Sequence, residues 1–150
     1  MWRKGDLRKL SAMNAADRIL VRDVVILLAL VRVALALLPV RWVFRILAPP
    51  ITPPREAPAN RAAEIARVRW AIMAAAARLP GTSSCLSRAL AGLLVLARRG
   101  LPATLHMGVA RAKSGGAAHA WLVSGQYDVS GGGDAASGFV PIAAFSVRES

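Results

Sequence analysis

The stretch PGTSSCLSRAL, residues 80–90, separates two helical patterns and contains the only cysteine of the 150-residue chain, Cys85. Its proline and glycine end the first pattern, and Ser83 or Ser84 can cap the helix that follows. Cys85 then falls in the first turn, where unpaired amides and the positive end of the helix dipole favour an anion, and so a nucleophilic thiolate. The alternative is that Cys85 is a small buried hydrophobe, which is common for a free cysteine.

A histidine that could act with Cys85 lies further along the chain. His119 opens HAWLV, residues 119–123, which is typical of a strand. A lone cysteine with an imidazole presented from a strand is the basis of a thiol enzyme. Trp121 is expected to stack over this histidine or to wall a pocket. His106, in the preceding predicted strand, is the rival base or a residue of the substrate groove.

Composition limits the classes of partner and the compartment. The length predicts one domain with an appended helix. Twenty Lys and Arg against eight Asp and Glu give a net charge of +12, which favours an acidic peptide, nucleic acid or an anionic membrane. Nucleic acid is disfavoured, because there is no basic run of five or six, no zinc-ligand spacing and only 5% aromatic residues. A single cysteine excludes an intramolecular disulfide and suits a reducing compartment, so we expect a cytoplasmic protein.

The most apolar part of the chain is VVILLALVRVALALLPV, residues 24–40, which has one charge, Arg32. It is shorter than the ~20 apolar residues that a membrane span needs. No small-residue cleavage site follows, so it does not resemble a signal peptide. Three interpretations remain: a buried helix packed on the domain, a helix that docks a partner, and a helix on a membrane surface.

Proline divides the first third of the chain. A helical pattern over residues 15–38 ends at Pro39, and residues 41–47 can form a short second helix. Five prolines in residues 48–58 predict an extended linker. We therefore predict an N-terminal hydrophobic helical segment over residues 1–47, a Pro-rich linker over 48–59 and the main domain over 60–150.

The rest of the chain predicts two helices and then a small antiparallel sheet. Asn60 can cap the first of these helices, and a two-residue hairpin turn is expected at residues 124–125. The nucleophile helix would pack on a sheet that carries the histidine, which is an α+β arrangement. The predicted helices are residues 61–79 and 85–99, and the predicted strands are 104–110, 118–123, 126–130 and 139–145.

Four motifs of this half occur together, namely CLSRAL at 85–90, LARRGLP at 96–102, MGV at 107–109 and HAWL at 119–122. This combination resembles the lasso-peptide leader peptidase family, which are transglutaminase-like maturation proteins related to a microcin-processing protease. A hydrophobic N-terminal helix before a proline-broken linker resembles the start of these proteins. The resemblance implies an α+β transglutaminase-like or papain-like cysteine protease domain over residues 60–150.

The resemblance also implies an activity and partners. It implies a stand-alone cysteine peptidase of ribosomal-peptide maturation in bacteria, which removes the leader from a lasso-peptide precursor so that a cyclase can close the macrolactam. A separate leader-recognition protein would present the precursor peptide. We expect no cofactor and no metal. The sequence has no phosphate-binding GxxxxGK[ST] loop, so any ATP coupling would belong to the complex. The alternatives are a transglutaminase-like amidase or acyltransferase, and a non-catalytic adapter that docks on a membrane or a complex.

The implied roles follow thiol-protease chemistry. Cys85 would attack the scissile carbonyl as a thiolate, and the backbone N–H of Cys85 is the nearest oxyanion donor. His119 would keep the thiol deprotonated and then protonate the leaving amine.

The third catalytic residue is where this chain departs from the family. The family commonly places an Asp where this chain has Gly131. If the hairpin turns at residues 124–125, Asp128 lies on the same face as His119, one pair along, within diagonal reach. We therefore predict Asp128 as the residue that orients the imidazole, with Asp134 as the alternative. If neither acid does so, the enzyme is a Cys–His dyad.

Overall fold

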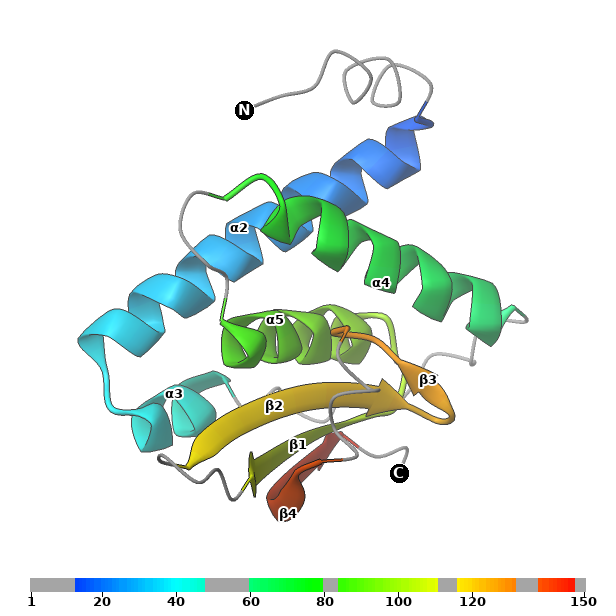
Figure 1. Cartoon of the computed structure of the whole chain (residues 1–150). Helices are drawn as coiled ribbons and strands as arrows, with labels where there is room; N and C mark the ends of the chain where they lie inside the picture. Colours follow the sequence, from blue (N-terminus) through cyan, green and yellow to red (C-terminus); the bar gives the residue numbers. More distant parts are fainter. Residues whose placement is uncertain (1–12, 48–59, 80–83, 111–115, 132–137, 148–150) are drawn as a thin grey trace.

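The computed structural model describes five stretches of the chain, residues 13–47, 60–79, 84–110, 116–131 and 138–147. In them, helices cover one face of a four-stranded antiparallel sheet (Figure 1). The predicted α+β class with a small antiparallel sheet is confirmed. The helices are α2 (Ala15–Leu37), α3 (Val40–Leu47), α4 (Arg61–Ala76) and α5 (Cys85–Arg98), and the strands are β1 (Ala103–Ala110), β2 (Ala117–Ser124), β3 (Tyr127–Asp128) and β4 (Val140–Val147).

The strand order of the sheet is β3-β2-β1-β4, so that β1 and β2 lie at its centre. In the β1–β2 pair, His106 lies opposite Trp121, and Gly108 lies opposite His119. β4 pairs with the other edge of β1, with a register shift between Met107 and Gly108. The two central strands therefore carry both histidines of the chain.

Local sequence explains where two of the helices begin. The Asn14 side chain accepts a hydrogen bond from the Asp17 amide at 2.8 Å and caps α2. Ser84 is the cap of α5, because its hydroxyl accepts the Ser87 amide at 3.1 Å. The side chain of Asn60 makes no such bond, so the expected side-chain cap of α4 is absent.

The α5 helix is the centre of the core. It contacts α2, α4, β1 and β2, and its residues from Ala89 to Leu96 are all buried. Gly92 allows this close packing: a Cβ there would lie 2.7 Å from Leu122 Cδ2 and 2.9 Å from Ile72 Cδ1. Because real Cβ atoms do not approach so closely, a larger residue at this position would force the Leu122 and Ile72 side chains, or α5 itself, to shift.

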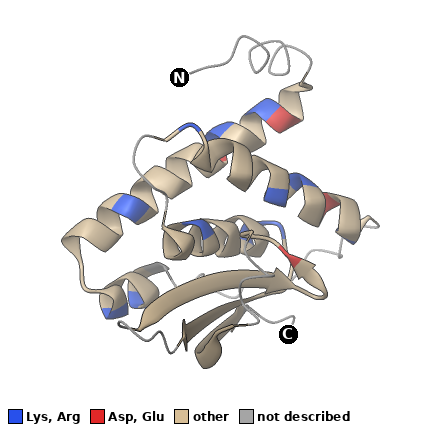
Figure 2. Ribbon diagram, in the orientation of Figure 1, with Lys and Arg blue, Asp and Glu red and all other residues tan. Residues whose placement is uncertain are grey.

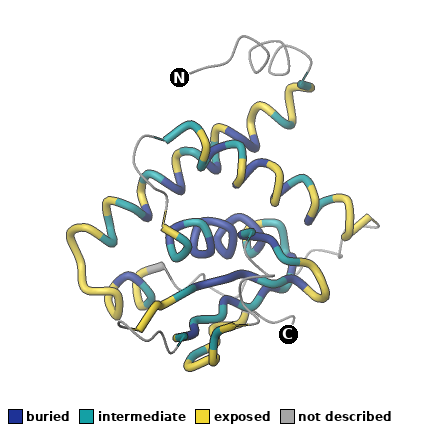
Figure 3. The backbone as a smooth tube through the Cα atoms, viewed as in Figure 1, coloured by how far each residue is buried: buried dark blue, intermediate teal, exposed yellow. Residues whose placement is uncertain are grey.

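The α2 helix packs on the domain with one side only. Its buried residues join the same core cluster as α4 and α5, while its opposite side is exposed (Figure 3). The first of the three interpretations thus describes the inner side of α2. No helix of the described residues is long and apolar enough to span a membrane. The predicted linker lies outside the described residues, and the division at 1–47, 48–59 and 60–150 stays a prediction.

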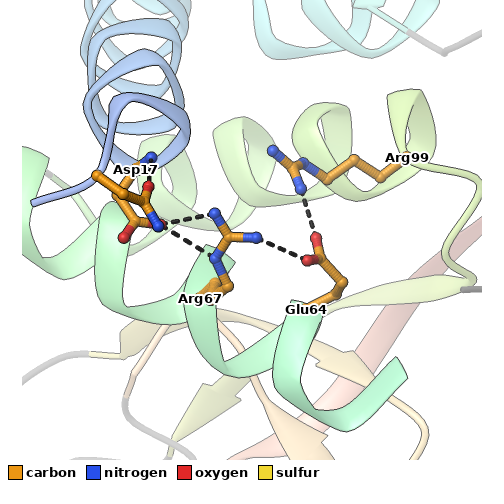
Figure 4. A network of polar contacts seen from close by, with 5 residues as sticks. Asp17, Glu64, Arg67 and Arg99 are labelled. Carbon is orange, nitrogen blue, oxygen red and sulfur yellow. Dashed lines mark hydrogen bonds and ion pairs between the residues drawn. The ribbon is translucent and has the colours of Figure 1, made fainter. Parts of the chain in front are cut away.

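A network of ion pairs ties α2, α4 and α5 together (Figure 4). Arg67 binds Asp17 at 2.6 Å and Glu64 at 2.8 Å. The second oxygen of Glu64 binds Arg99 at the end of α5. Hydrogen bonds to Asp17, and then to Glu64, raise the pKa of Arg67 above its ordinary value, so this guanidinium stays charged at the centre of the network.

The hairpin between β2 and β3 differs from the prediction. Val123 pairs with Asp128 and Ser124 pairs with Tyr127, so the turn residues are Gly125 and Gln126. Gly125 has φ +59°, a left-handed conformation that glycine adopts without strain. The glycine therefore occupies the first turn position. The turn lies one residue later than expected, so the expected pairing of β2 with β3 was wrong by two residues.

The other helix and strand boundaries differ less from the predicted ones. The α4 helix ends at Ala76, three residues before the predicted end, and α5 ends at Arg98, one residue before it. The return strand β3 is shorter than the predicted 126–130, and β4 is displaced toward the C-terminus relative to 139–145.

Candidate functional site

Cys85 is the first residue of the central helix α5. It is half-buried and packs against the core cluster. The Ser84 cap holds this first turn, and the Ser87 hydroxyl also donates to the Ser84 carbonyl at 3.0 Å. The thiol therefore lies where the free amides of a fixed helix start favour negative charge, as the sequence predicts.

His119 is the third residue of β2 and lies among aromatic side chains. Its ring stacks on Trp121, with centroids 5.8 Å apart, and contacts Phe139 at 5.1 Å. A Cβ on the opposing Gly108 would lie 3.1 Å from both Trp121 and Phe139, so glycine makes room for this cluster. His119 Nε2 is buried and has no hydrogen-bond partner within the described structure. A buried polar atom without a partner is uncommon and calls for an explanation.

The rival base, His106, belongs to the same cluster. It lies on β1 directly opposite Trp121, and the two rings stack with centroids 5.4 Å apart. The indole thus stacks on both imidazoles, which confirms the expectation that Trp121 stacks on His119, and Trp121 is buried. The sequence does not reveal the contributions of Gly108 and Phe139, since these depend on the register of β1 with its two neighbours.

The structure does not join the two predicted catalytic residues by a hydrogen bond. Side chains alternate along a strand, and Leu122 faces α5 because it is the neighbour of Gly92. His119 and Trp121 therefore lie on the face of β2 that points away from α5. No hydrogen bond joins Cys85 to His119 in the described structure. α5 and β2 start at the same end of the two layers, however, so both residues lie toward that end (Figure 1).

Asp128 is not beside His119. In the observed register Asp128 pairs with Val123, four residues beyond His119 on β2, or about 13 Å along the strand at about 3.3 Å per residue. One oxygen of its carboxylate accepts the Gly131 amide at 3.2 Å, and the other lies 3.8 Å from Arg69. The diagonal contact that supported Asp128 is thus absent.

Two other positions bear on the third catalytic residue, Asp134 and Gly131. Asp134, the alternative acid, lies outside the described residues. Gly131, the position at which the resemblance predicts an Asp, has φ +76°, and a Cβ there would lie 3.2 Å from the Met73 sulfur. An Asp at this position would be strained and crowded.

Metal chemistry has no obvious ligand set in the part of the chain that is described. No group of three or more His, Cys, Asp or Glu side chains lies close enough together there to hold a metal ion. The candidate groups for thiol chemistry in these stretches are the Cys85 thiol, the two imidazoles and the amides at the start of α5.

A cysteine at the start of a central helix that packs on an antiparallel sheet carrying a histidine defines a thiol-enzyme type of fold. The sequence profile of the transglutaminase-like superfamily matches residues 27–144, which is most of the chain, and the match begins within α2. The chain belongs to the transglutaminase-like superfamily, whose members are usually cysteine-dependent enzymes. No curated protein and no solved structure gives a significant match.

Proposed function

We propose that this protein is a cysteine peptidase that removes the leader from a lasso-peptide precursor. The observation that carries the proposal is the position of Cys85, at the capped start of the central helix of a transglutaminase-like domain. The four motifs from CLSRAL to HAWL support the finer assignment to leader removal. Leader cleavage needs only a nucleophile, a base and an oxyanion donor, and this chain has residues for all three.

The reaction would pass through a thioester. The Cys85 thiolate attacks the scissile carbonyl carbon, and the backbone N–H of Cys85 donates to the oxyanion. The C–N bond then breaks as the imidazolium of His119 gives its proton to the departing amine. A water molecule attacks the thioester, His119 accepts the water proton, and the Cys85 sulfur leaves as the leader carboxylate is released.

The surroundings of the His119 Nε2 atom support the proposed role of His119 as the base. This nitrogen is buried and makes no hydrogen bond among the described residues, a state that costs about 1–3 kcal/mol relative to a satisfied one. It is therefore available to bind a proton or the thiol. The Cys85–His119 hydrogen bond would form in the substrate complex, because catalytic hydrogen bonds often tighten only there.

The group that orients His119 would not be the predicted Asp128. Asp128 already binds Gly131 and Arg69, so the pair Cys85 and His119 would act as a dyad or with Asp134. His106 has the same aromatic neighbour as His119 and is the base to test against it.

The partners follow from the same proposal. A leader-recognition protein would present the precursor peptide in the cytoplasm, and a macrolactam-forming cyclase would take the released core peptide. The net charge of +12 would help to hold an acidic leader or partner.

The test is leader release from a candidate precursor in the presence of its recognition protein, followed by mass spectrometry. We expect the wild type to release the leader and Cys85→Ala to release none, with circular dichroism showing that the variant is folded. Release that persists in Cys85→Ala would overturn the proposal. A product in which an added amine replaces water at the cleaved carbonyl would instead assign an acyltransferase. Binding of the precursor without any product would assign an adapter.

A further inference from the structure

The corner between α2 and α3 is an exposed apolar part of the described chain (Figure 3). All residues from 36 to 42 are exposed, and Leu37 is 76% exposed. This run contains Leu38, Val40 and Trp42 as well, so apolar side chains project around the whole bend. We call residues 36–42 the α2–α3 bend.

The apolar surface continues from the bend along the outer side of α2. Ile26, Leu30, Val33 and Leu37 follow one another at intervals of four, three and four residues and are each half exposed or more. They form one stripe, because residues at this spacing share a helix face. A helix of a soluble domain normally has polar residues on its outer side. This contiguous apolar surface therefore indicates an interaction site.

The charges around this surface are of one sign. No Asp or Glu occurs between Asp23 and Glu56. Arg41 and Arg45 are exposed on α3, and the Arg45 guanidinium lies 5.7 Å from the centre of the Trp42 ring. Figure 2 shows basic but no acidic positions on α3 and on the adjoining half of α2. The surface thus combines exposed aliphatic side chains, a tryptophan and cations.

We propose that the α2–α3 bend and the outer stripe of α2 dock this protein on an anionic membrane. Aliphatic side chains would enter the boundary of the acyl chains, Trp42 would lie at the headgroup level, and the two arginines would bind lipid phosphates. The basic rim complements anionic lipid, which attracts each nearby arginine by electrostatics. The bend is a convex corner at the edge of the molecule (Figure 1). A partner helix binds in a groove, whereas a convex corner can insert into a flat lipid surface, so the shape favours lipid. This docking is peripheral and is independent of the proposed peptidase activity.

Co-sedimentation of the full chain with lipid vesicles tests the proposal. The protein should sediment with mixed phosphatidylglycerol and phosphatidylcholine vesicles, less with phosphatidylcholine alone, and less again at high salt. Leu37→Glu should lower the vesicle partition coefficient by about tenfold or more, because it places a like charge beside anionic lipid and removes buried apolar area.

Two tryptophans of equal exposure provide a matched pair. Trp42 on α3 is 45% exposed and Trp70 on α4 is 44% exposed. Trp42→Ala should weaken vesicle binding by about tenfold, since an interfacial tryptophan is lost, whereas Trp70→Ala should leave binding unchanged. Equal losses in the two variants, or no binding of the wild type to anionic vesicles, would overturn the proposal. A dimer in light scattering that Leu37→Glu dissociates would also overturn it and assign the surface to a second copy of the chain.

Discussion

The two faces of β2 differ in what covers them. On one face Leu122 packs beneath Gly92 of α5 and belongs to the main core. On the other face His119 and Trp121 belong to an aromatic cluster with His106 and lie outside that core. One short strand therefore stabilises the domain through its even positions and holds the candidate base through its odd ones. Changes on the two faces should separate stability from activity.

The largest effect is expected for a substitution on the odd face of β2, which carries His119 and Trp121, and the quantity that changes is kcat. His119→Ala should lower kcat for leader release by about 10²- to 10⁴-fold, the usual contribution of a general base, with little change in the free energy of unfolding. Mass spectrometry of timed reactions gives the rate, and urea unfolding gives the stability.

His106→Ala is the matched control, because the His106 ring stacks on the same indole as the His119 ring. It should lower kcat by less than about tenfold if it only supports the cluster. The reverse ranking of the two variants would make His106 the base and would leave His119 as its support.

Substitutions on the even face of β2, which carries Leu122, should lower the free energy of unfolding instead. Leu122 is fully buried, so Leu122→Ala should reduce the free energy of unfolding by about 2–5 kcal/mol through lost burial and a cavity. Val123→Ala, on the half-buried odd side of the same strand, should cost less than half as much. A smaller loss for Leu122→Ala than for Val123→Ala in urea denaturation would show that α5 does not cover the even face.

A sharper test of the same contact adds volume. Gly92→Ala places a methyl group 2.7 Å from Leu122 Cδ2, and such overpacking costs about 1–3 kcal/mol. The better helix propensity of alanine recovers about 1 kcal/mol, so the net loss should be about 1 kcal/mol. Gly116→Ala is the control, because its nearest neighbour would be 3.9 Å from the new Cβ, and its stability should be unchanged. Thermal melts of equal midpoint for both variants would contradict the close packing of α5.

Much of this arrangement can be predicted from local sequence. The Pro-Gly stop, the Ser84 cap and the start of α5 at Cys85 follow from the sequence near residue 85. The four strands and their antiparallel pairing follow from alternation and turn residues.

The face of His119 could not be predicted in this way. It depends on which side of β2 is covered, and that is set by Gly92 of a helix distant in sequence. The register of the hairpin could not be predicted either, because Ser124 and Gln126, the neighbours of Gly125, are both compatible with a turn. The left-handed φ of Gly125 and the strand pairing show that Gly125 and Gln126 form it.

The smallest effect is expected at the other end of the odd face. Asp128→Asn should change kcat by less than about threefold, because Asp128 lies near the far end of β2 and its carboxylate binds Gly131 and Arg69. An amide oxygen can still accept the Gly131 amide, so the turn after β3 should persist.

Asp134→Asn is the comparison variant for the same assay. A loss of a hundredfold or more in Asp134→Asn alone would make that residue the one that orients His119, and equal activity of both variants would make the enzyme a dyad. A loss of that size in Asp128→Asn would contradict the β2–β3 register, since a carboxylate that pairs beside Val123 cannot reach an imidazole four residues away on β2. In that case the whole odd face of β2 would have to rearrange when substrate binds, because a movement of the His119 ring alone could not bring it to Asp128.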